Sequence, residues 1–429
     1  MRRIFKVAVM IVLSFLFACY IFGFISYAGI EFDDEKMDYS ISIKGIKNSV
    51  AFDVNKDGEF IIAKKDKILY LKKDGKIETL YSDSQNNIID MVLKDSIIYM
   101  VKGNTLFSFD IDTKKLKQLL NNIPIRGQEN ECKLLVNGEN VLLSIGAVSN
   151  SGIIEDKQMA FGQEVYDRTP IDLYSTGKVF GKYNTGAFSP IGKSVSEGEK
   201  INGTLPANAC ILSIDKNNKI KVFASGIKNV IGFGITSDGN LIAAVSGMEE
   251  KGIRPISNDK DYIYEIKEGD WLGWPDFSGG DPVTSPRFRV NEEKVNFLLQ
   301  NHMTENPKSP LYQHKDVNSI SCMTLLNNDI YKDNVLFYDK KDSTLDILKN
   351  NRLPFKILKL NKRSKIVDLK NVNQSIYMLD GEKGVIYNIF NKSNANSNNS
   401  NILVYYFIGI ILAGVIFIEG KKMNEKLSK

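Results

Sequence analysis

Short apolar runs recur along the chain between residues 40 and 390, and turn-forming residues separate them. Helical periodicity is scarce in this region, whereas runs bounded by Asp-Gly, Asn-Gly or Lys/Asn turns are typical of strands joined in hairpins. The clearest unit spans residues 49–82, and its apolar runs lie at 50–54, 60–63, 68–71 and 77–81. Four strands in about 35 residues are the size of one propeller blade.

The same unit recurs along the rest of the chain. Further blades are expected at residues 88–120, 132–223, 230–266, 319–360 and 366–390. The run at 39–44 precedes the first blade and is predicted to complete the last one, because a closed ring leaves no exposed sheet edge. The pattern therefore predicts an all-β fold, a six-bladed β-propeller.

Two long insertions interrupt the blades. The first, residues 148–209, is rich in Gly, Ser and Pro and is too long for an ordinary hairpin turn. The second contains both tryptophans of the chain, Trp271 and Trp274, with Arg254 upstream of them. Indole rings in an irregular loop suit a planar ligand or a sugar, so these three residues are candidates for a substrate pocket. The alternative is a structural loop in which the tryptophans seal one face of the propeller.

The two ends of the chain are apolar and carry its excess charge. Of a formal net charge of +5 in 429 residues, +3 lies in residues 1–30 and +2 in residues 401–429. The apolar stretches in both ends are long enough to cross a bilayer as helices, and the positive-inside rule places both termini in the cytoplasm. The expected organisation is a membrane anchor at 1–30, an extracytoplasmic propeller at 31–390, a polar linker at 391–401, a transmembrane helix at 402–418 and a basic tail at 419–429.

A cleaved signal peptide is the alternative for the first segment, because Leu16-Phe17-Ala18-Cys19 resembles a lipobox and would be lipidated at Cys19. The apolar run continues to Ile30, and signal peptides have shorter apolar cores, so an uncleaved anchor is favoured. Residues 31–400 carry no net charge, so no basic surplus indicates a nucleic-acid partner. The expected location is the cell membrane.

Few residues are of the types that bind metal ions or act as nucleophiles. Cys132, Cys210 and Cys322 are widely spaced without a CxxC pair and are expected to be buried thiols. The chain has two histidines, His302 and His314, both in the second insertion. A histidine in a loop is more often solvated than a ligand or base.

Several motifs resemble the glucose/sorbosone dehydrogenase family. They are Gly226-Ile227-Lys228-Asn229 with Gly234, the strand Asp261 to Ile266, and Gly273-Trp274-Pro275. The resemblance covers most of residues 42–390 and implies a six-bladed propeller that binds pyrroloquinoline quinone (PQQ) and Ca²⁺ and oxidises sugars. It also implies that Lys228 and Asn229 lie at the quinone, and that Asp261 and Gly247 lie at the metal.

The sequence departs from this family at the catalytic positions. Active members have a histidine base just before the third blade, but residues 128–131 contain no histidine, and Glu129 is the candidate substitute base. Lys228 stands in place of an arginine, which keeps the charge but loses the bidentate fork. The aspartate expected after the first hairpin of the third blade is Ala147.

Two functions follow from these observations. The first is a PQQ- and Ca²⁺-dependent dehydrogenase that oxidises a sugar or aldehyde and passes electrons to an acceptor in the membrane. The second is a catalytically degenerate propeller that binds a glycan, a cell-wall component or an envelope protein. The motifs favour the first function, and the missing histidine and aspartate favour the second.

Overall fold

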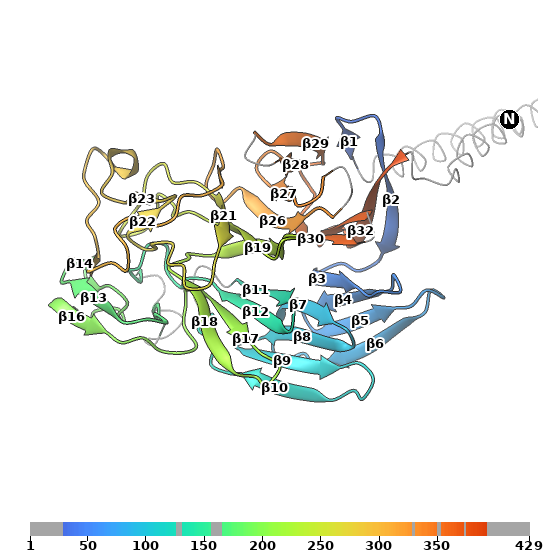
Figure 1. Ribbon diagram of the computed structural model, residues 1–429, viewed down its shortest axis with the longest axis horizontal. Helices are drawn as coiled ribbons and strands as arrows, with labels where there is room; N and C mark the ends of the chain where they lie inside the picture. The colour runs from blue at the N-terminus through green and yellow to red at the C-terminus, as the bar shows by residue number, and fades with distance from the viewer. Residues whose placement is uncertain are drawn as a thin grey trace, which may run out of the picture.

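The computed structural model describes residues 29–125, 131–155, 165–327, 331–349, 353–372 and 375–392. Six antiparallel sheets of four or five strands form the blades of a propeller (Figure 1). Within these residues the one helical element is a 3-10 helix, η2 (Pro286–Phe288). The all-β prediction is confirmed.

The first three blades follow one another along the chain. Blade 1 contains β3 (Ser49–Val54), β4 (Phe60–Lys64), β5 (Lys67–Leu71) and β6 (Ile77–Ser82). Blade 2 contains β7 (Ile88–Lys94), β8 (Ile97–Lys102), β9 (Thr105–Asp110) and β10 (Leu116–Leu120). Blade 3 contains β11 (Cys132–Asn137), β12 (Asn140–Ile145), β17 (Cys210–Ile214) and β18 (Ile220–Ser225).

The other three blades take strands from distant parts of the chain. Blade 4 contains β19 (Val230–Ile235), β20 (Leu241–Val245), β21 (Tyr262–Ile266) and β25 (Tyr312–Gln313). Blade 5 contains β26 (Ile320–Leu325), β27 (Val335–Asp339), β28 (Thr344–Leu348), β29 (Phe355–Lys359) and β1 (Glu31–Phe32). Blade 6 contains β30 (Ile366–Val372), β31 (Ser375–Asp380), β32 (Val385–Asn391) and β2 (Met37–Lys44).

Strand β2 closes the ring. It pairs antiparallel with β32, with Met37 opposite Asn391 and Lys44 opposite Val385. The prediction that residues 39–44 complete the last blade is therefore confirmed. Because β2 is followed directly by blade 1, this pairing covers the edge of blade 6 with a strand from the other end of the domain.

The first strand of each blade lines the propeller axis. Figure 1 shows β3, β7, β11, β19, β26 and β30 gathered at the centre of the molecule, and each contacts the next around the ring. Apolar side chains fill the space between blades; Val92, Leu134 and Leu212, for example, share one buried cluster between blades 2 and 3. Since the inner strands all begin at the same end of the axis, the residues that precede them surround one opening.

Carboxylates on the inner strands connect neighbouring blades. Asp90 on β7 accepts a hydrogen bond of 2.7 Å from the backbone N–H of Leu134 on β11. Asp368 on β30 accepts one of 3.1 Å from Phe52 on β3, across the closure of the ring. Asp53 makes the same kind of bond between blades 1 and 2. These bonds fix the relative position of strands that share no sheet ladder.

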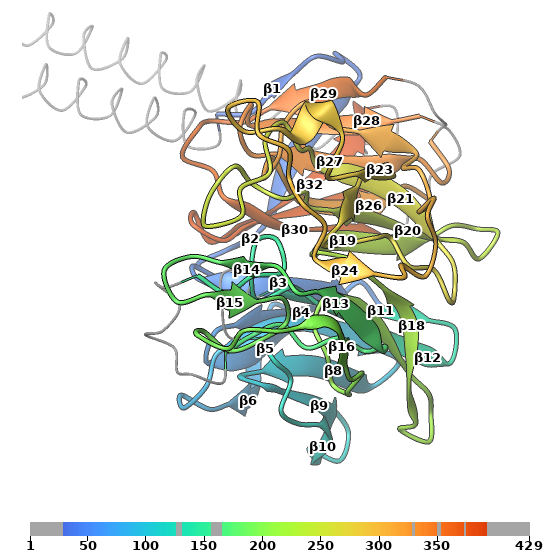
Figure 2. The ribbon, with the colours of Figure 1, turned by 90° about the vertical axis from the view of Figure 1, so that its left-hand side faces the viewer.

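The two insertions fold together on one side of the ring. A sheet of β13 (Leu173–Thr176), β16 (Glu197–Ile201) and β24 (Leu299–Gln300) takes strands from both. Two short pairs, β14 (Val179–Phe180) with β15 (Thr185–Gly186) and β22 (Phe277–Ser278) with β23 (Asp281–Pro282), complete this region. Figure 2 shows the strands of the first insertion and β24 in front of the blades. A buried apolar core that includes Phe188, Trp274 and Phe288 joins the two insertions.

The segment before β2 meets the C-terminal end of the described chain at blade 6. The backbone N–H of Lys392 donates to the carbonyl of Lys36 at 2.7 Å. No helix among the described residues is long and apolar enough to cross a membrane. Residues 1–28 and 393–429, which hold most of the predicted anchor and linker and all of the predicted C-terminal helix and tail, lie outside the described residues.

Candidate functional site

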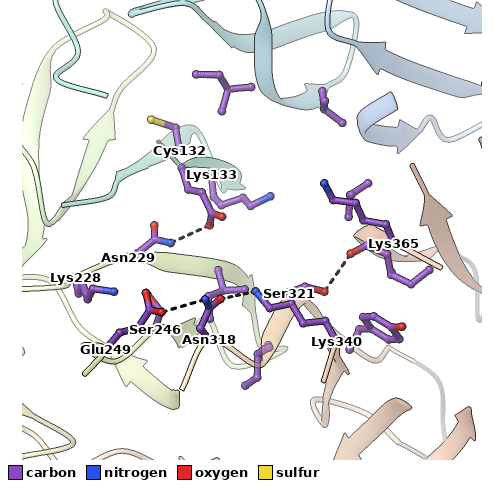
Figure 3. A pocket seen from close by; sticks show the side chains of 18 of the residues that line it. Cys132, Lys133, Lys228, Asn229, Ser246, Glu249, Asn318, Ser321, Lys340 and Lys365 are labelled. Carbon is purple, nitrogen blue, oxygen red and sulfur yellow. Dashed lines mark hydrogen bonds between the residues drawn. The ribbon is translucent and has the colours of Figure 1, made fainter. Parts of the chain in front are cut away.

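A cavity of about 460 Å³ opens at the end of the axis where the inner strands begin. A volume of this order suits a cofactor or small ligand. Figure 3 shows side chains from several blades around it. Its charged and amide lining consists of Glu131, Lys133, Lys228, Asn229, Glu249, Asn318, Lys340 and Lys365, and its apolar lining includes Val50, Ile89, Ile231, Ile320 and Ile366.

Four lysines converge on this cavity from different blades. Lys133 lies on β11, Lys228 precedes β19, Lys340 directly follows β27 and Lys365 directly precedes β30. Figure 3 shows Lys133 and Lys228 on one side of the open space and Lys340 and Lys365 on the other. Two glutamates share the lining, so the side chains leave a net excess of positive charge, which suits an anionic ligand.

Lys133 stays protonated although it lies in the channel of the propeller. Burial opposes its charge, but Asp90, Asp368 and Glu131 outweigh this effect and raise the pKa of Lys133 above its usual value. Asp90 and Lys133 also line a second cavity further along the axis, where they face Lys370. The same carboxylates that connect the blades therefore keep an ammonium group charged at the floor of the first cavity.

Several buried side-chain oxygens at the cavity have no hydrogen-bond partner among the described residues, including Oδ1 of Asn229, Oγ of Ser246 and Oγ of Ser364. A buried polar atom without a partner is costly, and a few per hundred residues is the usual number. Their convergence on one cavity offers hydrogen-bonding positions to a polar ligand.

Two hydrogen bonds connect blades at the cavity mouth, Asn229 with Glu131 and Asn318 with Glu249. Asn229 donates from Nδ2 to Glu131 Oε2 at 2.9 Å. Asn318 accepts a hydrogen bond from Lys340 through Oδ1. It donates from Nδ2 to Glu249 Oε2 at 3.5 Å. Although burial favours the neutral acid, Lys251 and Lys228 lower the pKa of Glu249, which holds it ionised.

The loop that carries Lys228 and Asn229 is held by the second insertion. The backbone N–H of Trp274 donates to the carbonyl of Gly226 at 2.9 Å. Gly226 has φ +65°, and a Cβ there would lie 2.6 Å from the ring of Trp271. Glycine is therefore required at this position, because only glycine adopts this backbone conformation without strain and leaves room for the indole.

Of the residues predicted at the cofactor, Lys228 and Asn229 line the cavity, 4% and 3% exposed. Glu129, the predicted substitute base, lies outside the described residues. Glu131, two positions later, is the carboxylate that the structure places there. Sequence reasoning missed it, although its position directly before the first inner strand of blade 3 was a usable signal.

Arg254, Trp271 and Trp274 are not among the residues lining the central cavity. The two tryptophans are 5% and 4% exposed and pack inside the insertions. Arg254 is 3% exposed and makes an ion pair of 2.9 Å with Asp276. Their placement matches the alternative of a structural loop, in which the tryptophans brace the loop around Gly226 rather than face a ligand.

Asp261 and Gly247, the residues predicted at the metal, do not line the cavity either. The carboxylate of Asp261 is fully buried and accepts four backbone N–H groups, those of Gly247, Asn318, Ser319 and Ile320. These bonds occupy the four lone-pair directions of a carboxylate and join blades 4 and 5. Within the described ranges no group of three or more His, Cys, Asp or Glu side chains could hold a metal ion.

The histidines and cysteines are structural. His302 lies 3.1 Å from Asp276, and His314 lies 3.2 Å from Asp339, both through Nε2. Neither lines the cavity. The three cysteines of the described chain, Cys132, Cys210 and Cys322, are buried free thiols, as expected, and burial raises the pKa of each.

Comparison with known proteins identifies the fold. No family model and no curated protein sequence matches the chain. A Trichoderma reesei structure of carbohydrate-active enzyme family AA12 matches with a TM-score of 0.58 at 11% identity, over 85% of this chain and 98% of that one.

Two further solved structures have names that state a cofactor or activity. The holo PQQ domain of pyranose dehydrogenase from Coprinopsis cinerea has a TM-score of 0.55 at 11% identity, over 85% and 97% of the two chains. The soluble aldose sugar dehydrogenase from Escherichia coli matches with a TM-score of 0.54 at 11% identity, over 82% of this chain and 99% of that one. The fold is therefore that of the PQQ-dependent sugar dehydrogenases.

Proposed function

We propose that the central cavity binds a planar, carboxylate-bearing cofactor of the PQQ class, and that the protein is a dehydrogenase-like oxidoreductase acting on a sugar or aldehyde. The observation that carries the proposal is the convergence on one cavity of four lysines and of buried oxygens that have no partner among the described residues. Solved structures of the same fold include PQQ-bound proteins from Coprinopsis cinerea and Streptomyces coelicolor.

The cavity residues match the chemistry of PQQ. Its carboxylates would pair with Lys228, Lys340 and Lys365, and charge-assisted hydrogen bonds of this kind are the strong ones. The hydroxyls of Ser246 and Ser364 would donate to its remaining oxygens. The isoleucines at the starts of the inner strands offer an apolar surface to the fused rings.

The proton of the substrate hydroxyl requires an acceptor from the chain. When bound, PQQ supplies the acceptor for the hydride of the oxidised carbon. Glu131 lies at the cavity mouth, and its hydrogen bond from Asn229 fixes its orientation. A general base must come within hydrogen-bond reach of the proton it removes. The role expected of Glu129 is therefore proposed for Glu131.

Dye reduction by the full-length chain with added PQQ and a panel of aldoses and aldehydes tests this function. Substrate-dependent reduction supports the dehydrogenase. Saturable PQQ binding without reduction of the dye by any substrate supports the second function, a non-catalytic binding propeller. The observation that favours this second function is the position of His302 and His314, neither of which lines the cavity.

We further propose that the propeller is held at the outer face of the cell membrane, with both termini in the cytoplasm and an electron acceptor in the membrane. The meeting of Lys36 and Lys392 at blade 6 supports this location, because it brings the two flanking segments to one edge of the domain. Protease added to intact cells should remove the propeller, and protection of the propeller would contradict the topology.

A further inference from the structure

We infer that the cavity holds its carboxylate ligand directly through lysine ammonium groups, without a bridging divalent cation. This inference rests on the proposed function, because it describes how the same cavity binds the same class of ligand. A calcium structure of the AA12 protein is among the structural neighbours, so calcium is the ion that the likeness implies. The donor set of this chain does not fit that ion.

The first reason is the state of the cavity carboxylates. Calcium takes six to eight oxygen ligands, with carboxylates prominent among them. Glu131 is engaged by Asn229, and Glu249 by Asn318 and the ammonium of Lys251. Each glutamate already has a donor that a calcium ion would have to displace.

The second reason is that the nearest buried carboxylates already accept hydrogen bonds from groups within the fold. Asp261 accepts four backbone N–H groups. Asp259 accepts from the backbone of Met248 and from the hydroxyls of Tyr262 and Ser278. Gly247 lies between these two aspartates and the carbonyl of Lys260, where even a Cβ would find that oxygen 2.0 Å away. The contacts of this segment therefore leave no space for a calcium ion beside Gly247.

The third reason is the charge that a ligand meets. Lys228 is 4% exposed, so its ammonium group acts in a medium with little screening by water. Lys133 adds a second ammonium at the floor, and Lys340 and Lys365 stand exposed at the mouth. A divalent cation entering this space would be repelled, whereas the same field attracts carboxylates.

Two probes test the inference on the full-length chain after dialysis against EDTA. One is PQQ, and the other is trimesate, a planar tricarboxylate with no quinone. Each is titrated in EDTA and again with excess CaCl₂. We expect saturable binding in EDTA that calcium does not strengthen, and that salt weakens because the contacts are ionic.

A variant separates direct binding from binding through a metal. Glu249→Gln removes a negative charge from the cavity and keeps an amide that can pair with Asn318, so carboxylate binding in EDTA should tighten several-fold. If a metal bridged the ligand to the protein, loss of this carboxylate would instead weaken the binding measured with excess CaCl₂. Glu139→Gln is the matched control, because the side chain of Glu139 is 81% exposed and remote from the lining residues.

The outcomes distinguish the inference from the proposed function. Binding of both probes in EDTA supports both. Trimesate binding without PQQ binding supports the inference and overturns PQQ as the cofactor. PQQ binding that requires calcium overturns the inference and leaves the proposed function standing. Absence of binding by either probe under all conditions overturns both.

Discussion

Asn229 donates a hydrogen bond of 2.9 Å from Nδ2 to Glu131, and this bond joins the start of blade 3 to the start of blade 4 at the cavity mouth. It also leaves Oδ1 of Asn229 buried, with no partner among the residues that the structure describes. The pair thus presents a positioned carboxylate and an open acceptor to the same space. Proposing Glu131 as the base gives this arrangement a chemical role.

Replacing Glu131 by Gln should separate binding from turnover. The amide can still pair with Asn229, and removal of a negative charge should leave PQQ affinity equal or higher. Turnover in dye reduction should fall about 100-fold or more, which is the usual contribution of a general base. The exposed Glu139→Gln variant should behave as the wild type. An unchanged turnover in Glu131→Gln would remove Glu131 from the mechanism.

The Arg254–Asp276 pair should control the stability of the insertions. Both side chains are almost fully buried, 2% and 0% exposed, at 2.9 Å. Arg254→Met leaves Asp276 buried without its cation, which typically costs about 3–5 kcal/mol. Lys221→Met, which breaks an ion pair whose side chains are 52% and 58% exposed, should cost under about 1 kcal/mol. Denaturant unfolding measures the free energy of unfolding of both variants. Equal losses of this free energy would contradict the structural role given to Arg254.

Asp167 should make stability fall as pH rises between about 4 and 6. Burial raises its pKa from 3.8 to about 6, against the hydrogen bonds from Ser149 and Val148. Below about pH 4 both folded and unfolded states are protonated; above it the unfolded carboxyl ionises first, so unfolding becomes easier until the folded carboxyl also ionises. The total loss is about 3 kcal/mol at one pKa unit per 1.36 kcal/mol.

Asp167→Asn isolates this effect, because the amide does not titrate. The difference in unfolding free energy between wild type and variant is measured by urea unfolding from pH 4 to pH 7. Over this range the wild type should lose most of this amount relative to the variant. A difference independent of pH would contradict the assignment.

Asp368 should stabilise the closure of the ring. Its carboxylate accepts the backbone N–H of Phe52, which is fully buried, across the junction of blades 6 and 1. Asp368→Ala leaves that N–H without a partner and should cost about 1–3 kcal/mol. Asp57→Ala, in an exposed turn of blade 1, should have little effect. The two midpoints of thermal unfolding compare them, and a neutral Asp368→Ala would show that the bond adds nothing to closure.

The blades could be predicted from the sequence because each is a local pattern of apolar runs and tight turns. The closing strand at 39–44 was also predictable, because a ring has to cover its last edge. Strand β25 (Tyr312–Gln313) was missed as the outer strand of blade 4, since two residues beyond a long insertion carry no periodic signal. Strand β1 (Glu31–Phe32) was missed for the same reason.

The site was only partly predictable. Lys228 and Asn229 followed from a motif, but Lys340 follows β27 and Lys365 precedes β30, so they belong to different blades and share no local pattern. Trp271 and Trp274 look like ligand-facing rings in sequence, because composition cannot tell an indole that faces a cavity from one that braces a glycine turn. Their burial against Gly226 is a property of the tertiary fold.

Titration of the full-length chain with PQQ, in wild type and in Lys340→Met/Lys365→Met, tests whether the cavity lysines bind PQQ. We expect saturable binding of one PQQ per chain and, in the double variant, an affinity lower by about 100-fold or more, because each charge-assisted contact contributes about 1.5–3 kcal/mol. Lys341→Met/Lys362→Met, which changes neighbouring lysines outside the cavity lining, should bind as the wild type does. Absence of saturable binding, or equal affinity in the cavity variant and the wild type, would show that these lysines do not bind PQQ.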